Sequence, residues 1–160
     1  MKLVLASNSP RRRELLAGLG YPYEVRVLEG IDESYPENLR GNEIASYISK
    51  AKADAYKELI ASDELIITAD TIVCLDERVL GKPSDEAEAI SMLHSLSGRT
   101  HQVYTGVTLT TIQHQTSFVS CTMLHLLTCL MKKFNIMSLI FVHTIRLVDM
   151  VYKNGLAMLV

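Results

Sequence analysis

One carboxylate stands where it could do acid or base chemistry. Asp70 follows the apolar and β-branched run 65–69, which predicts that Asp70 ends a buried strand. Ligands of α/β proteins bind at that edge of the sheet, and a buried carboxylate is costly unless a metal or a cation holds it. Asp70 is therefore a candidate catalytic residue. The alternative is an aspartate that only begins a turn at Thr71.

A loop near the N-terminus is a candidate phosphate site. Residues 3–6 are typical of a short buried strand, Ser9 stands at an N-cap position, and Pro10 can open a helix. Free N–H groups at a helix N-terminus attract anions. Arginines 11–13 crowd the first turn, where the helix dipole disfavours cations, so a bound polyanion or nearby carboxylates would compensate. An isolated run of three arginines is more often a solvated face.

Further charged residues complete the set. Glu33 lies on an acidic turn, Lys52 on a predicted helix and Lys82 in a Gly-Lys-Pro turn. Taken singly, each is most often a solvated surface residue. As a group, the cations would hold a triphosphate, and Glu33 and Asp70 would bind Mg²⁺ or Mn²⁺ and activate water. The four cations are Arg11, Arg12, Lys52 and Lys82.

Other familiar sites are not indicated. The sequence has no GxxxxGK[ST] loop and no GxGxxG after the first predicted strand. Ser7 and Ser9 are not in a GxSxG elbow, and no histidine is placed to suggest a triad. The cysteines, Cys74, Cys121 and Cys129, lack metal or disulfide spacing, which favours reduced thiols in the cytosol. A net charge of -2 favours neither nucleic acid nor an anionic membrane as a general partner.

Strands and helices alternate along the first 112 residues, which predicts an α/β fold in one domain or two small lobes. The predicted strands are 3–6, 23–28, 64–73, 71–75 paired with 79–80, and 100–112 with a break at 105–106. The predicted helices start at Pro10 and end at Gly18, cover 42–59, and run from Ser84 to Leu96.

The motifs, in this order, resemble the Maf family of nucleotide pyrophosphatases, also called septum-formation proteins. The resemblance covers residues 2–121 and rests on LASNSPRRRELL at 5–16, DES at 32–34, KAKADA at 50–55, TADTIV at 68–73, LGKPSDEAEAISMLHSLSG at 80–98 and THQVYTGV at 100–107.

The resemblance implies a cytoplasmic α/β protein with a Maf/ITPase-like mixed sheet, flanking helices and a central cleft, and a possible homodimer. It implies hydrolysis of a nucleoside triphosphate to the monophosphate and pyrophosphate with a divalent metal. Asp70 falls on the catalytic position, and Glu33 and Asp70 on metal positions. Arg11 and Thr71 indicate the class acting on dTTP and UTP. The substrate-binding positions are Ser7, Arg11, Arg12, Lys52, Thr71 and Lys82.

The chain changes character near Cys121. Of its 18 acidic residues only Asp149 follows position 121, and residues 122–160 have poor binary patterning. One account is a buried apolar helix pair. The other is a frameshift product. Shifted by one nucleotide, codons 144–158 allow D-K-A-G-G-Y-G-I-Q-E-W-x-G-Y and codons 129–136 allow S-D-E-E-I-Q-Y, and both strings resemble the family's continuation. The predicted domains are 1–121, Maf-like and incomplete, and 122–160, an atypical tail. A truncated sheet would fold poorly.

Two other functions compete with an enzyme. A nucleotide-binding protein that regulates cell division without turnover would need the same residues. A membrane-associated protein would use the apolar tail, but residues 134–145 are too short and too polar to span a bilayer. We expect no secretory leader, because arginines 11–13 interrupt the N-terminus before an apolar stretch develops.

Overall fold

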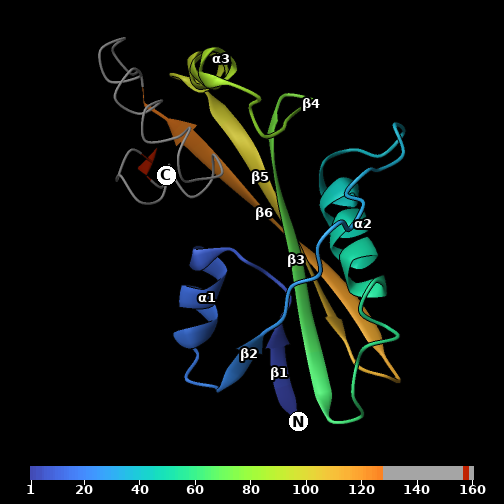
Figure 1. Ribbon diagram of the computed structural model, residues 1–160. Coiled ribbons are helices and arrows are strands. Elements are labelled where there is room, and N and C mark those ends of the chain that lie inside the picture. Colours follow the sequence, from blue (N-terminus) through green and yellow to red (C-terminus); the bar gives the residue numbers. More distant parts are fainter. Residues whose placement is uncertain (128–156, 159–160) are drawn as a thin grey trace. The chain divides into compact units, whose positions relative to one another are not determined.

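The computed structural model describes residues 1–127 and 157–158. The chain divides into two compact units. Unit 1 contains Met1–Thr71 and Thr105–Ser120, and unit 2 contains Ile72–Tyr104 and Cys121–Val160. Strands β3 (Glu64–Leu75), β5 (Thr100–Thr110) and β6 (Gln115–Leu126) each supply residues to both units. The predicted α/β class with a mixed sheet and flanking helices is confirmed (Figure 1).

Within unit 1, strand β1 (Lys2–Leu5) lies between β2 (Tyr23–Val25) and β3 and is parallel to both. Leu5, the last residue of β1, pairs with Val25 and Ile67. β3 continues past this point beside β5, which is followed by β6. Because β1 ends at Leu5, it does not pair with β3 beyond Ile67. From about residue 68 onward, β1 no longer covers that edge of β3.

A small apolar core fixes the parallel strands and also shortens two predicted elements. Val4 and Ile66 pack with Tyr56, whose hydroxyl donates to the Arg26 carbonyl at 3.0 Å and accepts from the Leu28 N–H at 2.9 Å. The sequence predicts a strand over 23–28, but β2 ends at Val25. It is shorter because β1 ends there and the backbone after Val25 bonds to Tyr56.

Helix α1 (Pro10–Ala17) begins where the sequence predicts. Ser9 occupies the N-cap position, but its side chain makes no capping hydrogen bond. Its N–H instead donates to Ser7 Oγ at 3.2 Å. The predicted end at Gly18 is also found, and Gly20 takes the positive φ of 75° that lets the chain turn towards β2.

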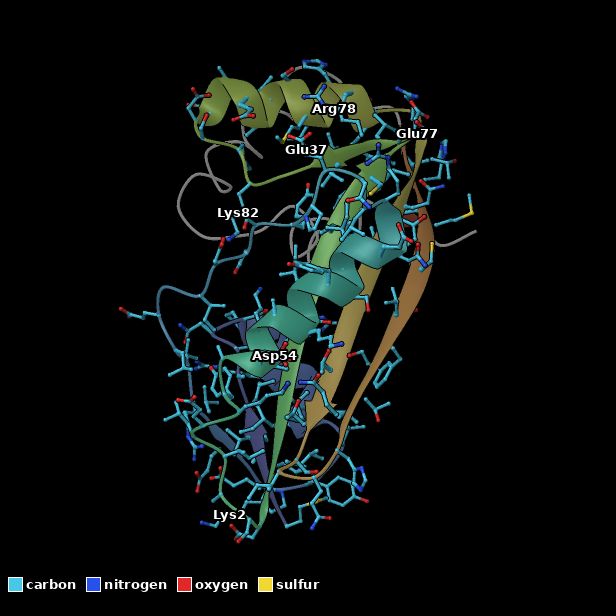
Figure 2. The ribbon with its side chains drawn as sticks, turned by 90° about the vertical axis from the view of Figure 1, so that its right-hand side faces the viewer. Lys2, Glu37, Asp54, Glu77, Arg78 and Lys82 are labelled. Atoms are coloured by element: carbon cyan, nitrogen blue, oxygen red, sulfur yellow. The ribbon has the colours of Figure 1, made fainter. Side chains whose placement is uncertain are left out.

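Helix α2 (Gly41–Asp54) is shorter than the predicted 42–59. Beyond Asp54 the N–H groups of Tyr56 and Leu59 bond three residues back, in turns that bring Tyr56 into the core. Helices α1 and α2 lie on opposite sides of β1 and β3 in Figure 1, and Figure 2 shows α2 in front of the strands with Asp54 at its end.

Two predictions about the long strands are wrong. Asp70 lies inside β3, not at its carboxyl end, because β3 keeps β5 as a neighbour after β1 has ended. β5 runs through Thr105 and Gly106 without a break. Glycine is required at 106 for another reason: a Cβ there would stand 2.2 Å from the Ala45 carbonyl oxygen of α2.

In unit 2, β4 (Arg78–Leu80) forms the predicted antiparallel hairpin with the end of β3. Helix α3 (Glu86–Leu96) is capped by Asp85, whose carboxylate accepts from the Glu88 N–H at 2.8 Å. β7 (Ala157–Met158) pairs with the last two residues of β6. β6 itself continues past Cys121 with Leu124 and Leu126 buried.

The shifted-frame strings at 129–136 and 144–158 lie outside the described residues, apart from 157–158. Among residues 1–127 and 157–158, no helix is long and apolar enough to cross a membrane.

Candidate functional site

A buried lysine joins two carboxylates in unit 1. Lys52 Nζ lies 2.6 Å from Asp70 Oδ1 and 3.0 Å from Glu33 Oε1. Lys52 and Asp70 are 9% and 6% exposed, whereas the Glu33 side chain is 43% exposed. The ammonium thus connects a carboxylate in the interior with one that water can reach. Charge-assisted hydrogen bonds of this length in a partly buried place hold the three groups in a defined arrangement.

The loop that carries Glu33 is held by its neighbours. The Asp32 carboxylate accepts from the Ser34 N–H and from the Ser34 hydroxyl, each at 2.8 Å. These bonds form an Asx turn around Glu33 and lower the pKa of Asp32 below its ordinary 3.8. The DES motif at 32–34 therefore has a local structural role for its first and last residues and leaves Glu33 to meet Lys52.

A second group of predicted residues gathers around Arg12 of α1. Arg12 donates to the Ala69 carbonyl at 2.9 Å, to Ser7 Oγ at 3.3 Å and to Thr71 Oγ1 at 3.3 Å. Ser7 is 7% exposed. The guanidinium thereby ties the loop after β1 to the part of β3 that β1 leaves uncovered.

The two groups meet at consecutive residues of one strand. Successive side chains of a strand point to opposite faces. Asp70 accordingly meets Lys52 of α2, and Thr71 meets Arg12 of α1. The structure therefore brings the predicted residues to one stretch of β3, in two groups on its two faces. The first holds Glu33, Lys52 and Asp70, and the second Ser7, Arg12 and Thr71.

The remaining predicted cations lie elsewhere. Arg11 pairs with Glu14, three residues on in α1, at 3.6 Å, and both side chains are largely exposed. Lys82 is exposed and belongs to unit 2. For both residues, binding to a substrate stays a prediction.

The donor set fits a hard cation that completes its coordination with other ligands. Residues 1–127 contain no group of three or more His, Cys, Asp and Glu side chains that could hold a metal by themselves. Glu33 and Asp70, however, supply two carboxylates around one cationic centre, the Lys52 ammonium. Mg²⁺ is commonly bound by one or two carboxylates together with phosphates and water. Metal binding by Glu33 and Asp70 stays a prediction.

Sequence reasoning missed several hydroxyl groups beside these residues. Thr105 of β5 meets Thr71, with 3.2 Å between their Oγ1 atoms. Ser49, Thr68 and Thr108 are buried and bonded to one another next to Lys52 and Asp70. Only the position of Thr68 within TADTIV could have drawn attention to one of them, since Ser and Thr in apolar stretches carry no distinctive pattern.

The arrangement can perform acid and base chemistry next to an anion site. Lys52 holds the Asp70 carboxylate through Oδ1, and Oδ2 is the other atom that could take a proton. Arg12, Ser7 and the N-terminus of α1 offer donors of the kind that phosphate oxygens accept.

The chain resembles known proteins over most of its described length. A protein of Bacteroides thetaiotaomicron named dTTP/UTP pyrophosphatase is 58% identical over 119 residues, which cover 74% of this chain and 62% of the relative. A protein of the same name from Phocaeicola vulgatus is 59% identical over 121 residues, 76% of this chain and 63% of the relative. The match thus spans a little under two thirds of these curated relatives.

Fold and family agree with this similarity. The solved structure of the Staphylococcus aureus Ham1 protein matches with a TM-score of 0.51 at 17% identity, over 79% of this chain and 72% of that one, which shows a shared fold. The family model described as Maf-like protein matches residues 2–135. The chain therefore belongs to the Maf-like protein family.

Proposed function

We propose that this protein is a nucleoside triphosphate pyrophosphatase that hydrolyses dTTP and UTP to the monophosphate and pyrophosphate. The observation that carries the proposal is the buried Lys52 between Asp70 and Glu33. The names of the relatives from Bacteroides thetaiotaomicron and Phocaeicola vulgatus support the choice of substrate.

Asp70 is the general base in this proposal. Its Oδ2 takes a proton from the attacking water, the water oxygen bonds to phosphorus, and the α–β phosphoanhydride bond breaks. The leaving phosphate oxygen carries the electron pair away. Lys52 orients Asp70 through the 2.6 Å contact and places positive charge beside the reacting phosphate.

The substrate lies across the edge of β3 that β1 leaves uncovered, so that its phosphates meet Asp70 on one face of the strand and Arg12 on the other. Arg12 and Ser7 donate to phosphate oxygens, with the N–H groups at the start of α1 adding to the positive potential. Thr71 sets the preference for a pyrimidine base. Arg11 adds charge around the triphosphate, and substrate binding by Lys82 stays a prediction.

A divalent cation belongs to the proposal. Mg²⁺ or Mn²⁺ bound by Glu33 and Asp70 would neutralise phosphate charge and make water more acidic. Removal of the metal with EDTA is expected to abolish turnover, and added Mn²⁺ to restore it.

Release of pyrophosphate from UTP tests the proposal. Wild-type protein with Mn²⁺ is expected to release pyrophosphate, and Asp70→Asn to lose about 10²- to 10⁴-fold in kcat, the usual contribution of a general base. Asp63→Asn, at an exposed aspartate just before β3, is the matched control and should keep wild-type activity. Binding of UTP without release by the wild type would instead favour a regulatory nucleotide-binding protein.

We also propose that the Maf-like domain ends near residue 121 and that residues 122–160 are a frameshifted tail. The matches to the curated relatives, over 119 and 121 residues, are shorter than the chain, and the family model matches residues 2–135. Such a tail would lack the residues with which the resembled family completes its site, so a chain carrying the shifted-frame continuation is expected to release pyrophosphate faster than this one. The cytoplasmic location and the homodimer stay predictions.

A further inference from the structure

One face of α2 contacts the sheet through three residues of very different chemistry. Ala45, Ser49 and Lys52 are spaced by four and three residues, so they lie along one side of the helix. All three are buried. Lys52 forms the ion pair with Asp70. The contacts that hold Ala45 and Ser49 therefore determine the position of the Lys52 ammonium.

Ala45 lies against bare backbone. Gly106 of β5 approaches so closely that even a methyl group would collide with the Ala45 carbonyl. This contact sets the distance between α2 and β5, but a smooth contact with a glycine does not prevent the helix from sliding along the strand.

Ser49 is bonded in a directed chain of hydroxyl groups. Its Oγ donates its single proton to the Ser46 carbonyl at 2.9 Å. Thr108 Oγ1, 3.0 Å away, must therefore be the donor to Ser49 Oγ, and Ser117 Oγ, 2.8 Å from Thr108, must donate to Thr108. The chain runs from β6 through β5 into the backbone of α2. Hydrogen bonds depend on direction, so this chain fixes the position of α2 along the strand.

Thr68 makes the same link from β3. Its hydroxyl is fully buried and donates to the Ser49 carbonyl at 2.8 Å. Thr68 and Asp70 are two residues apart on the strand and so point to the same face. Lys52 follows Ser49 by one helical turn. Two bonds therefore join α2 to β3 side by side: Thr68 to Ser49, and Lys52 to Asp70. They are separated by one turn along the helix and by two residues along the strand.

We propose that Thr68, Ser49 and Thr108 are positioning residues that place the Lys52 ammonium on Asp70. The proposal rests on the proposed function for its effect on turnover. Without these hydroxyl groups α2 keeps its apolar contacts but loses its register on β3 and β5. A displacement of about 1 Å at a reacting group can cost on the order of 10²-fold in rate.

A test independent of catalysis follows the Lys52 ammonium by ¹H–¹⁵N NMR of the full chain. An ammonium buried between two carboxylates exchanges its protons slowly and gives a signal, which Lys52→Met assigns by its loss. Thr68→Val removes the hydroxyl at nearly constant shape and is expected to abolish or shift that signal. Thr68→Ser, which keeps the hydroxyl, is expected to restore it.

Thr110→Val is the matched control. Thr110 is a buried threonine of β5 on the same face as Thr108. Its hydroxyl accepts a long bond of 3.4 Å from Gln115, whose 2.9 Å bond to Asp54 of α2 does not need the Thr110 hydroxyl. This variant is expected to lose a similar amount of stability and to keep the Lys52 signal. Equal changes of the signal in Thr68→Val and Thr110→Val would overturn the proposal. If Thr68→Val does not fold, Thr108→Val takes its place.

Kinetics with UTP supply the second readout. Thr68→Val is expected to lower kcat on the order of 10- to 100-fold with KM changed less than about threefold, with recovery in Thr68→Ser and no change in Thr110→Val. A wild-type protein without turnover would contradict the proposed function, and the NMR comparison would still decide the positioning role. A kcat in Thr68→Val equal to that of Thr110→Val would overturn the effect on turnover.

Discussion

Lys52 forms a buried ion pair with Asp70 in unit 1. It is buried beside Asp70, and an ion pair in such a place is costly to break, because the partner left behind is a buried charge without compensation. The lysine therefore has a structural consequence that is separate from any role in turnover.

We expect Lys52→Met to lower the free energy of unfolding by about 3–5 kcal/mol, and the added change Asp70→Asn to recover part of the loss. Urea unfolding measures both. Lys57→Met is the control: Lys57 pairs with Asp54 at 2.7 Å at the surface, and such pairs contribute about 0.5 kcal/mol. Equal losses in the two lysine variants would show that Lys52 is not in a desolvated pair.

Glu64 makes unfolding depend on pH in a defined window. Its carboxylate accepts from Arg26 Nη1 and Nη2 at 2.9 and 2.6 Å and from the Ala61 N–H at 3.0 Å. These contacts, the Arg26 bonds first, lower the pKa of Glu64 from 4.5 to about 2. Between these values the unfolded chain binds a proton and the folded chain does not.

The free energy of unfolding is therefore expected to fall as the pH falls from 4.5 towards 2, and to be unaffected by this group above pH 4.5. Glu64→Gln should flatten the dependence in that window, as urea titrations at several pH values would show. Glu58→Gln, at an exposed position, serves as control. An unchanged slope in Glu64→Gln would rule out the Arg26 pair as its source.

For single residues, the sequence predicted which residues belong to the site better than it predicted which of them contact one another. Asp70 and Lys52 were selected by charge and motif. That Lys52 meets Asp70 depends on the packing of α2 on β3, which no local pattern specifies. The hydroxyl of Thr68 was missed because a threonine in an apolar strand looks like any β-branched residue.

The elements meet most closely where α2 crosses β5. We expect Gly106→Ala to lower the free energy of unfolding by about 3 kcal/mol, because the added methyl meets the backbone of Ala45, which cannot move aside as a side chain could. Thermal or urea unfolding measures the effect. Gly81→Ala is the control, since a Cβ there has no neighbour within 4 Å. Equal stability of the two variants would contradict the close approach.

The starts of β2 and α2 were predicted better than their ends. Ser9 and Pro10 specify the start of α1 through local backbone chemistry. The ends of β2 and α2 depend on Tyr56, which lies far away in sequence from β2 and draws both chain segments into one core. Asp70 was placed at a strand end for the same reason: the continuation of β3 is supported by β5, a neighbour that only the fold reveals.

For the whole molecule, the proposed frameshift has a direct test in the gene. We expect the nucleotide sequence of codons 115–160 to contain, in the phase shifted by one, the D-K-A-G-G-Y-G-I-Q-E-W string at 144–158. Sequencing the gene decides this. A shifted phase interrupted by stop codons would contradict the proposal, and a sharp cooperative thermal transition of the purified chain would count against poor folding.

The division of the chain into two units has a further consequence for protein engineering. The first segment of unit 1 ends at Thr71 and its second begins at Thr105, and the Oγ1 atoms of these two residues lie 3.2 Å apart. Residues 72–104, the first of the two segments of unit 2, therefore depart from and return to nearly the same point. A hairpin loop of about two to five residues could close that gap. Every predicted site residue except Lys82 would be retained in such a miniature chain.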